Sequence, residues 1–232
     1  MVTIAHIHTP FSEKFGIPRQ SGFAASAQGT IVMEPQFRNP DAFKGIEEFS
    51  HLWLLWEFSR AKQDVFHATV APPRLGGKER RGVFATRSPF RPNSIGLSCV
   101  KLEQVAYDKE CGPMLTVSGV DLLDGTPIYD IKPYLPYADA HPEAVGGFAD
   151  AHVTDRIAVD FPQELLLKLP EELRAAAIDV LAQDPRAAYN KKPDYVYGMA
   201  FAGYDIRFVV RDGCLAVCDV LPREKEDFSK VK

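Results

Sequence analysis

The chain has 232 residues, of which 46% are hydrophobic and 25% are charged, which is ordinary for a globular protein with a sizeable core. It contains no run of 18 apolar residues, so we expect no membrane-spanning helix, and its first residues lack the pattern of a secretory signal. Both observations favour a cytoplasmic protein without a membrane partner. The four cysteines form no C-x-x-C pair, and no histidine stands at ligand spacing from Cys214 or Cys218. We therefore expect buried free thiols and no metal site.

The net charge of −4 argues against binding nucleic acid over the whole surface. Between residues 72 and 93, however, six basic residues stand against one acid, which gives this segment a charge of +5 and leaves −9 for the rest of the chain. The six are Arg74, Lys78, Arg80, Arg81, Arg87 and Arg91. A local basic patch on an acidic body is typical of a protein that contacts phosphates at one place, although arginines that serve only solubility are the alternative.

The first part of the chain has the rhythm of an all-β domain, with short apolar stretches between glycines and prolines. After a strand at 30–33, residues 40–48 fit a helical turn or short helix. Residues 51–58 are nearly all apolar and predict a strand buried on both faces. Further strands are expected at 82–86, 95–105 and 114–123. Five or six strands with no long helices between them predict a mainly β protein with a β-barrel.

The pattern changes after about residue 140, and residues 141–155 have the composition of a linker. Residues 169–183 predict a helix that begins near Pro170 and ends before Pro185. Two apolar segments at 204–210 and 214–220 flank Arg211-Asp212-Gly213, a strong hairpin signal. We therefore expect a barrel domain at residues 1–145 and a small C-terminal α+β domain at residues 156–223.

Two loops have a composition suited to binding anions or nucleotides. In the loop 16–22, glycines and a proline enclose Arg19 and Gln20, which could present backbone amides and a guanidinium to a ligand. In the loop 87–96, two prolines and an asparagine stiffen a segment from which Arg87 and Arg91 project. The alternatives are an ordinary surface turn for the first loop and a solvated loop for the second.

Two further segments carry candidate functional groups. In residues 122–134, Asp124-Gly125-Thr126-Pro127 forms a turn with a carboxylate and a hydroxyl, and three polar residues then alternate on one strand face: Asp130, Lys132 and Tyr134. Past the expected C-terminal helix, Arg186 and Tyr189 could meet RNA by phosphate contact and base stacking. The alternatives are a tight hairpin turn and a helix stop with a packed tyrosine.

Familiar catalytic signatures are missing from the sequence. It has no G-x-G-x-x-G after a strand, no P-loop, no H-E-x-x-H and no G-x-S-x-G. A dinucleotide-type cofactor site is therefore not supported, and the missing nucleophile motifs weigh against a small-molecule hydrolase.

Five motifs in a fixed order are similar to the TsaA-like (TrmO) family over residues 3–145, and 183–189 resembles the extension of its longer bacterial form. The motifs are Gly16-Ile-Pro-Arg-Gln-Ser-Gly, Phe49-Ser-His-Leu-Trp, Pro72-Pro-Arg-Leu-Gly-Gly, Phe84-Ala-Thr-Arg-Ser-Pro-Phe-Arg-Pro-Asn-Ser-Ile-Gly-Leu-Ser, and Asp124-Gly-Thr-Pro-Ile with Asp130-Ile-Lys-Pro-Tyr. The resemblance implies a homodimeric β-barrel methyltransferase that binds S-adenosyl-L-methionine without a Rossmann fold. The implied reaction is N6-methylation of N6-threonylcarbamoyladenosine at tRNA position 37, next to the anticodon.

The resemblance also implies a set of cofactor contacts in this chain: Pro18, Arg19, Gln20, Ser59, Arg60, Arg87, Asp124, Gly125, Thr126 and Pro127. Candidates for a general base are Asp130, Lys132 and Tyr134, and the expected RNA contacts are Lys78, Arg80, Arg81, Arg186 and Tyr189. The alternative is a non-catalytic RNA- or nucleotide-binding module built on a similar barrel. The missing nucleophile motifs weigh against a hydrolase, but the sequence distinguishes less well between a methyltransferase and such a binding module.

Overall fold

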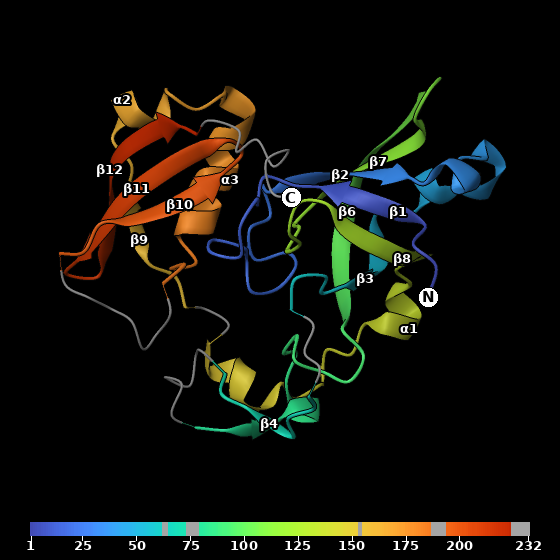
Figure 1. The fold of residues 1–232 in the computed structure, drawn as a ribbon, viewed down its shortest axis with the longest axis horizontal. Helices are drawn as coiled ribbons and strands as arrows, with labels where there is room; N and C mark the ends of the chain where they lie inside the picture. The colour runs from blue at the N-terminus through green and yellow to red at the C-terminus, as the bar shows by residue number, and fades with distance from the viewer. Residues whose placement is uncertain (62–64, 73–78, 153–154, 187–193, 224–232) are drawn as a thin grey trace.

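The computed structural model describes residues 1–61, 65–72, 79–152, 155–186 and 194–223. It contains a closed six-stranded barrel in the first part of the chain and a four-stranded sheet with helices in the last part (Figure 1). The expectation of a mainly β protein with a barrel and a small C-terminal α+β domain is confirmed. In the part of the chain that the structure describes, no helix is long and apolar enough to cross a membrane.

The barrel strands lie in the order β1-β2-β7-β6-β3-β8, and β8 pairs with β1 to close the barrel. All six pairings are antiparallel. The strands are β1 (Ala5–His8), β2 (Gln28–Met33), β3 (His51–Glu57), β6 (Ile95–Asp108), β7 (Gly112–Ser118) and β8 (Thr126–Pro133). The expected short helix at 40–48 is present as two 3-10 helices, η2 (Pro40–Phe43) and η3 (Ile46–Glu48). The other connections contain η1 (Pro35–Phe37), η5 (Val83–Ala85), α1 (Pro136–Asp139), η6 (Gly147–His152) and a small hairpin of β4 (Thr69–Val70) and β5 (Arg81–Gly82).

Strand β3 is fully buried on one face only, so the expectation of two buried faces was wrong. Leu52, Leu54 and Trp56 point into the barrel and are buried, whereas the alternate residues are half-buried. A barrel strand has one inner face, and its outer face is covered only where another segment lies on it. Trp53 shows such local cover, because its indole Nε1 donates to the Asp139 carboxylate of α1 at 3.0 Å.

The expectation of a strand at 82–86 was also wrong for the residues after Gly82. Strand β5 ends at Gly82, and Val83–Ala85 forms a 3-10 turn whose Thr86 amide donates to the Val83 carbonyl. The guanidinium of Arg91 donates to the carbonyls of Val83 and Thr86, at 3.2 and 2.7 Å. The backbone acceptors of this segment are therefore satisfied by a turn and a side chain in place of a neighbouring strand.

The C-terminal sheet has the order β10-β11-β12-β9, with β9 parallel to β12. Its elements are β9 (Ala158–Asp160), α2 (Gln163–Leu166), α3 (Glu171–Leu181), β10 (Tyr197–Phe201), β11 (Tyr204–Arg211) and β12 (Cys214–Pro222). The expected helix and hairpin are both present, and the turn residues Asp212 and Gly213 take φ values of 48° and 75°. The thiols differ from expectation: Cys218 is exposed, and the other three cysteines are half-buried.

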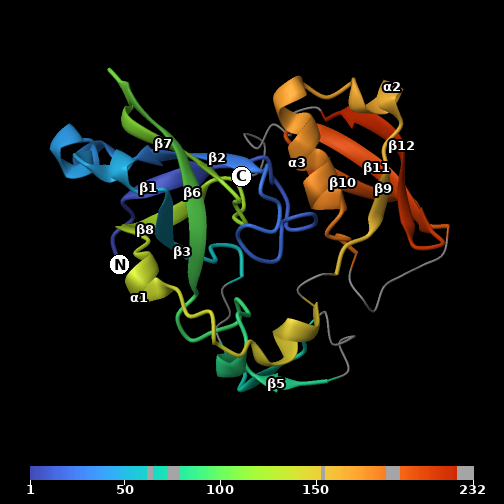
Figure 2. The same cartoon turned by 180° about the vertical axis from the view of Figure 1, so that it is seen from behind.

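The two units pack against each other through the segment between β1 and β2. The Phe11 and Phe201 rings meet edge to face at 6.0 Å, and Phe15 stacks on Phe208 at 6.5 Å. Helix α3 lies between the C-terminal sheet and the barrel (Figures 1 and 2), where Asp179 accepts the Ser26 amide at 3.1 Å. Buried residues of both units therefore form one continuous core.

Candidate active site

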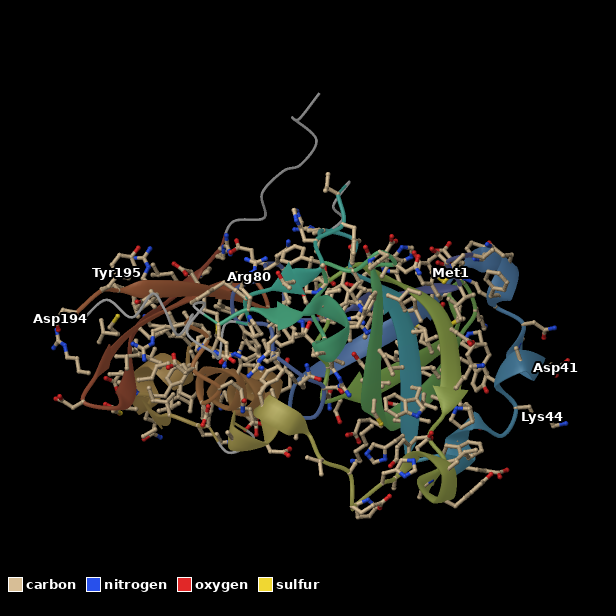
Figure 3. The ribbon with its side chains drawn as sticks, turned by 90° about the horizontal axis from the view of Figure 1, so that it is seen from below. Met1, Asp41, Lys44, Arg80, Asp194 and Tyr195 are labelled. Carbon is tan, nitrogen blue, oxygen red and sulfur yellow. The ribbon has the colours of Figure 1, made fainter. Side chains whose placement is uncertain are left out.

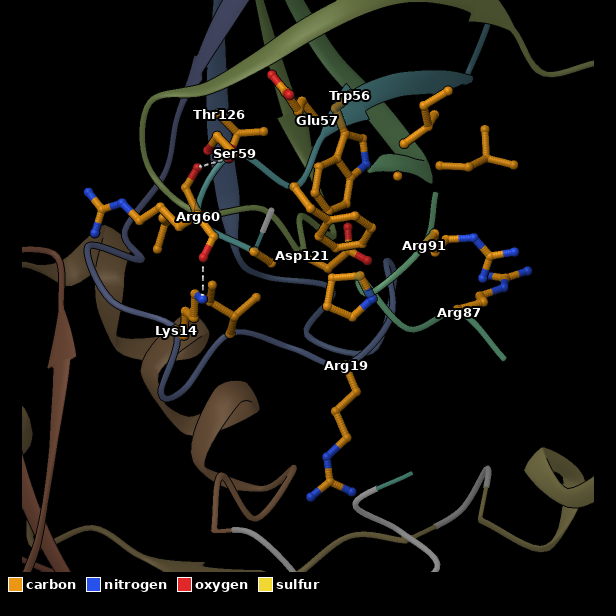
Figure 4. A pocket seen from close by; sticks show the side chains of 18 of the residues that line it. Lys14, Arg19, Trp56, Glu57, Ser59, Arg60, Arg87, Arg91, Asp121 and Thr126 are labelled. Carbon is orange, nitrogen blue, oxygen red and sulfur yellow. Dashed lines mark hydrogen bonds between the residues drawn. The ribbon is translucent and has the colours of Figure 1, made fainter. Parts of the chain in front are cut away.

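A cavity of about 560 Å³ opens beside strands β3 and β6. This is within the usual size range of small-molecule sites. Its polar lining consists of Lys14, Arg19, Gln20, Glu57, Ser59, Arg60, Thr86, Arg87, Arg91, Asp121 and Thr126, and its apolar lining includes Ile17, Pro18, Trp56, Phe58, Pro89, Phe90, Ile95, Leu97 and Leu123. Figure 4 shows Asp121 in the middle of this pocket, with Arg60 on one side and Arg87 and Arg91 on the other. A cavity with apolar walls, several cations and two carboxylates suits a ligand that carries both signs of charge.

The two loops that the sequence singled out meet at the pocket. The Arg87 guanidinium donates to Gln20 Oε1 at 2.5 Å, and Gln20 Nε2 donates to the Arg19 carbonyl at 2.6 Å. The loop 16–22 is fixed to the barrel, because Ser21 Oγ accepts the Cys99 amide of β6 at 3.2 Å. Residues 67 positions apart in sequence therefore form one polar wall.

The Arg19 side chain links this wall to the C-terminal unit. Its Nη2 donates to the carbonyls of Asp184 and Arg186, at 3.3 and 3.4 Å. Figure 4 shows the guanidinium turned away from Asp121. The turn that follows α3 thus supports a residue that lines the pocket.

The floor of the pocket is a chain of hydrogen bonds on the inner side of the barrel. Trp56 lies directly over Gly96 of the neighbouring strand, where a Cβ atom would collide with the indole ring. The Trp56 indole N–H donates to Ser98 Oγ at 2.9 Å, and Ser98 Oγ donates to the Asp121 carboxylate at 2.6 Å. The absence of a side chain at Gly96 therefore makes room for the Trp56 indole, the first donor in this series of hydrogen bonds.

The Asp121 carboxyl has a strongly altered acidity. Burial raises the pKa of Asp121 to about 6, against the opposing effects of the Ser98 hydrogen bond and the positive charge of Arg87. Perturbed carboxyl groups in a cavity mark candidate functional residues. Sequence reasoning missed Asp121, although one signal was available: it is an acidic residue between two apolar residues, Val120 and Leu122. Both of these neighbours are fully buried in the structure.

A second carboxylate, Glu57, lies on the same wall at the end of β3. The Tyr129 hydroxyl donates to it, and burial together with this hydrogen bond raises the pKa of Tyr129 to about 12. Trp56 and Glu57 were also missed, because the run of apolar residues at 51–58 is typical of a core strand.

Of the expected cofactor contacts, Pro18, Arg19, Gln20, Ser59, Arg60, Arg87 and Thr126 line the cavity. Asp124, Gly125 and Pro127 are not among the residues that line it. The Asp124 carboxylate instead accepts the Thr9 amide at 3.0 Å and lies 3.4 Å from His8 Nδ1. The turn thereby fastens β8 to the end of β1, in keeping with the alternative of a tight hairpin turn.

The three candidate bases are not among the residues that line the pocket. Lys132 Nζ forms an ion pair with the Asp130 carboxylate at 2.9 Å, and the Tyr134 ring packs against Trp53 at 5.8 Å. Residues 130 and 132 do share a face, as the alternation predicted, but this is the outer face of β8.

Of the expected RNA contacts, the structure describes Arg80, Arg81 and Arg186. Arg80 is exposed on the β4–β5 hairpin, where its guanidinium donates to Thr69, and Arg81 forms an ion pair with Glu79 at 2.6 Å. Figure 3 shows Arg80 on the surface between Met1, near one end of the molecule, and Asp194 near the other. Lys78 and Tyr189 lie outside the described residues.

Arg186 differs from the expectation of a phosphate contact. Its side chain is only 7% exposed and donates through Nε and Nη2 to both oxygens of Asp184, at 2.8 and 2.9 Å. Burial and the two-pronged bond to Asp184 favour a structural role for this guanidinium, in keeping with the alternative of a helix stop.

No group of three or more potential metal ligands occurs among the residues that the structure describes. The groups that the pocket does offer are four arginines, one lysine, two carboxylates and an aromatic wall.

Comparison with known proteins places this architecture among methyltransferases built on a barrel. The family model described as tRNA-methyltransferase O N-terminal domain matches residues 6–140, and the TrmO C-terminal domain model matches residues 154–223. The chain therefore belongs to the TrmO family.

Relatives and solved structures agree with this family. The tRNA (adenine(37)-N6)-methyltransferase of Escherichia coli is 41% identical, over 95% of this chain and 97% of its own. A putative S-adenosylmethionine-dependent methyltransferase of Pseudomonas aeruginosa is 44% identical, over 94% of this chain and 95% of its own. The crystal structure of TrmO from Pseudomonas aeruginosa superposes with a TM-score of 0.76 at 38% identity, covering 94% of this chain and 95% of that one.

Proposed function

We propose that this chain methylates N6 of N6-threonylcarbamoyladenosine at position 37 of tRNA, with S-adenosyl-L-methionine as the methyl donor. Membership of the TrmO family makes it an S-adenosylmethionine-dependent tRNA (adenine-N6)-methyltransferase. The threonylcarbamoyl group on the target is the finer part of the proposal, and it rests on the family resemblance.

One observation carries the cofactor assignment: the loops 16–22 and 87–96 join, through Arg87 and Gln20, at a cavity with an aromatic wall and two carboxylates. S-adenosylmethionine has a carboxylate, an ammonium group, a sulfonium and an aromatic base, so this donor set fits it. The guanidinium of Arg87 suits the carboxylate, and Trp56 and Phe58 supply apolar contact for the base. When bound, the cofactor supplies an activated methyl group, so alignment of the acceptor nitrogen is the main task of the protein.

We expect Arg87→Ala to weaken S-adenosylmethionine binding by about 1.5–3 kcal/mol, because the variant lacks a charge-assisted hydrogen bond. Isothermal titration calorimetry measures the change. Arg80→Ala is the matched control, since Arg80 is an exposed arginine of the same basic segment that does not line the cavity. Equal affinities in the parent and in a folded Arg87→Ala variant would remove Arg87 from the site.

The experiment that tests the function uses methyl-labelled S-adenosylmethionine and two tRNA preparations, one carrying the threonylcarbamoyl group and one lacking it. We expect label only in the preparation that carries this group. Equal labelling of both would contradict the finer substrate assignment, and no labelling of either would favour the non-catalytic RNA-binding alternative.

The tRNA is proposed to contact the basic segment and the C-terminal unit, with residues 1–145 as the cofactor-binding domain and residues 156–223 as the appended tRNA-contacting domain. Arg80 and Arg81 support this proposal by their position on a surface hairpin. A homodimer acting on cytoplasmic tRNA is part of the same proposal, supported by the exposed apolar residues Phe84, Phe90 and Leu97 beside the pocket. Light scattering that gave only monomer at micromolar concentration would contradict the dimer.

A further inference from the structure

We propose that Asp121 is the general base of the methyl transfer, accepting the proton that the adenosine N6 nitrogen loses as it is methylated. This inference rests on the proposed function and names a residue for the same site.

Position is the first argument. Asp121 is one of two carboxylates that line the pocket, and it lies in the middle of it (Figure 4). The other carboxylate, Glu57, points away from the middle of the pocket in the same view. The remaining acidic candidate from the sequence, Asp130, forms an ion pair outside the lining. Asp121 is therefore the carboxylate best placed to meet a group that enters the cavity.

The hydrogen bonds at the floor fix which form of Asp121 is present. An indole N–H can only donate, so Ser98 Oγ accepts from Trp56 and has a single proton of its own. That proton goes to Asp121 Oδ1, 2.6 Å away. Oδ1 is therefore held as an acceptor. Backbone amides of Asp121 itself and of Ser21 also donate to this carboxylate, so the surrounding hydrogen bonds favour the ionised, proton-accepting form. The chain Trp56–Ser98–Asp121 orients the carboxylate and leaves the uptake of a proton possible.

The acidity of the group agrees with this role. Because burial raises the pKa of Asp121 to about 6, the carboxyl is mostly ionised near neutral pH yet is far more basic than an ordinary aspartate. A general base is most effective when its pKa is close to the working pH. The charged groups that line the same cavity are Arg87, Arg19, Arg60, Arg91, Lys14 and Glu57. Of these, Arg87 lowers the pKa of Asp121 by its positive charge, whereas the Arg19 guanidinium is turned away from it.

The proposed step balances in atoms and charge. The N6 nitrogen attacks the methyl carbon, the new N–C bond forms, and the S–CH₃ bond breaks with its electron pair left on sulfur. The N6–H proton passes to Asp121. One sulfonium charge and one carboxylate charge are thus replaced by a neutral thioether and a neutral carboxylic acid. The ureido-type nitrogen is a poor nucleophile because its lone pair is delocalised into the carbonyl group and the purine ring, and without the base it would acquire a positive charge on methylation.

Asp121→Asn tests this step, because asparagine keeps the shape of the side chain and an acceptor for Ser98. We expect the single-turnover rate of methyl transfer to fall by at least about 100-fold, the scale of general-base catalysis, while the dissociation constant of S-adenosylmethionine changes less than about threefold. The parent rate should rise with pH through a midpoint near 6. Asp130→Asn, outside the pocket lining, is the control and should behave like the parent.

Ser98→Ala provides a second test that does not depend on the first variant. Removing its hydrogen bond to the ionised carboxylate should move the pH midpoint upward. Carboxyl-carbon NMR of labelled aspartate supplies a readout besides activity: one signal should titrate near pH 6, move upward in Ser98→Ala, and be missing in Asp121→Asn.

The outcomes separate this inference from the proposed function. If the parent transfers no methyl group to tRNA, the proposed function fails. If the parent is active and Asp121→Asn matches its rate, or loses cofactor affinity more than about tenfold, the assignment of Asp121 as a base is overturned. An aspartate signal that titrates near pH 4 throughout would overturn it as well.

Discussion

Asp121→Asn is expected to stabilise the folded protein by up to about 3 kcal/mol at pH 8, although it should impair catalysis. The pKa of Asp121 is raised by burial from its ordinary value of 3.8 to about 6. Each pKa unit corresponds to about 1.4 kcal/mol between the two protonation states. Because the folded pKa is the higher one, the folded state is favoured below pH 4 and loses that advantage as the pH rises through 6. Asparagine resembles the protonated form and does not incur this loss.

Urea denaturation of the parent and the variant at several pH values measures the effect. The gain should be largest at pH 8, about half as large at pH 5, and close to zero by about pH 3, as proton linkage requires. Asp108→Asn is a useful contrast, because backbone hydrogen bonds from Cys111 and Glu110 hold the pKa of Asp108 below its usual range, so this variant should bring no gain. A constant difference between parent and Asp121→Asn at all pH values would show that Asp121 is not penalised by burial. Residues placed for chemistry at the expense of stability are expected in active sites.

The sequence was informative where local chemistry determines the structure. The Asp212-Gly213 turn, the helix after Pro170 and the barrel strands β2, β3, β6 and β7 follow from turn residues and apolar periodicity. The end of β5 did not follow, because Val83 and Thr86 bond to Arg91, a partner that only the folded chain brings near. Local patterns cannot show which distant side chain takes over a backbone acceptor.

The candidate bases illustrate a second limit. Thr126 and Ile128 are buried on the inner face of β8, and strict alternation would place Asp130 and Lys132 on that same face. The pairing shifts, however: Leu55 lies opposite Asp130 and Trp56 lies opposite Ile128, which leaves Tyr129 as an extra residue. A bulge of one residue exchanges the faces of everything that follows. It therefore places Asp130 and Lys132 outside, and the carboxylate of the pocket comes from Asp121, on a different segment.

Arg186→Ala is expected to lower the free energy of unfolding by about 2–3 kcal/mol without changing the salt dependence of tRNA binding. Removing one partner of a buried ion pair costs roughly 3–5 kcal/mol, and the 20% exposure of Asp184 reduces that figure. Arg186 also lies over the Tyr197 ring at 6.0 Å, so the variant loses packing within the C-terminal unit as well. Since the Arg186 and Asp184 carbonyls support Arg19, we further expect weaker cofactor binding in the absence of tRNA.

The salt dependence distinguishes this structural role from a phosphate contact. Removing one phosphate-binding side chain lowers the slope of log affinity against log salt concentration by about 1. Arg80→Ala, which removes an exposed arginine of the basic segment, should reduce the slope by about 1 with little change in stability. Arg186→Ala should lower the stability and leave the slope unchanged. Urea denaturation, together with tRNA binding at several salt concentrations, therefore distinguishes the roles of the two arginines. A reduced slope and unchanged stability in Arg186→Ala would mean that its guanidinium leaves Asp184 to bind the tRNA backbone.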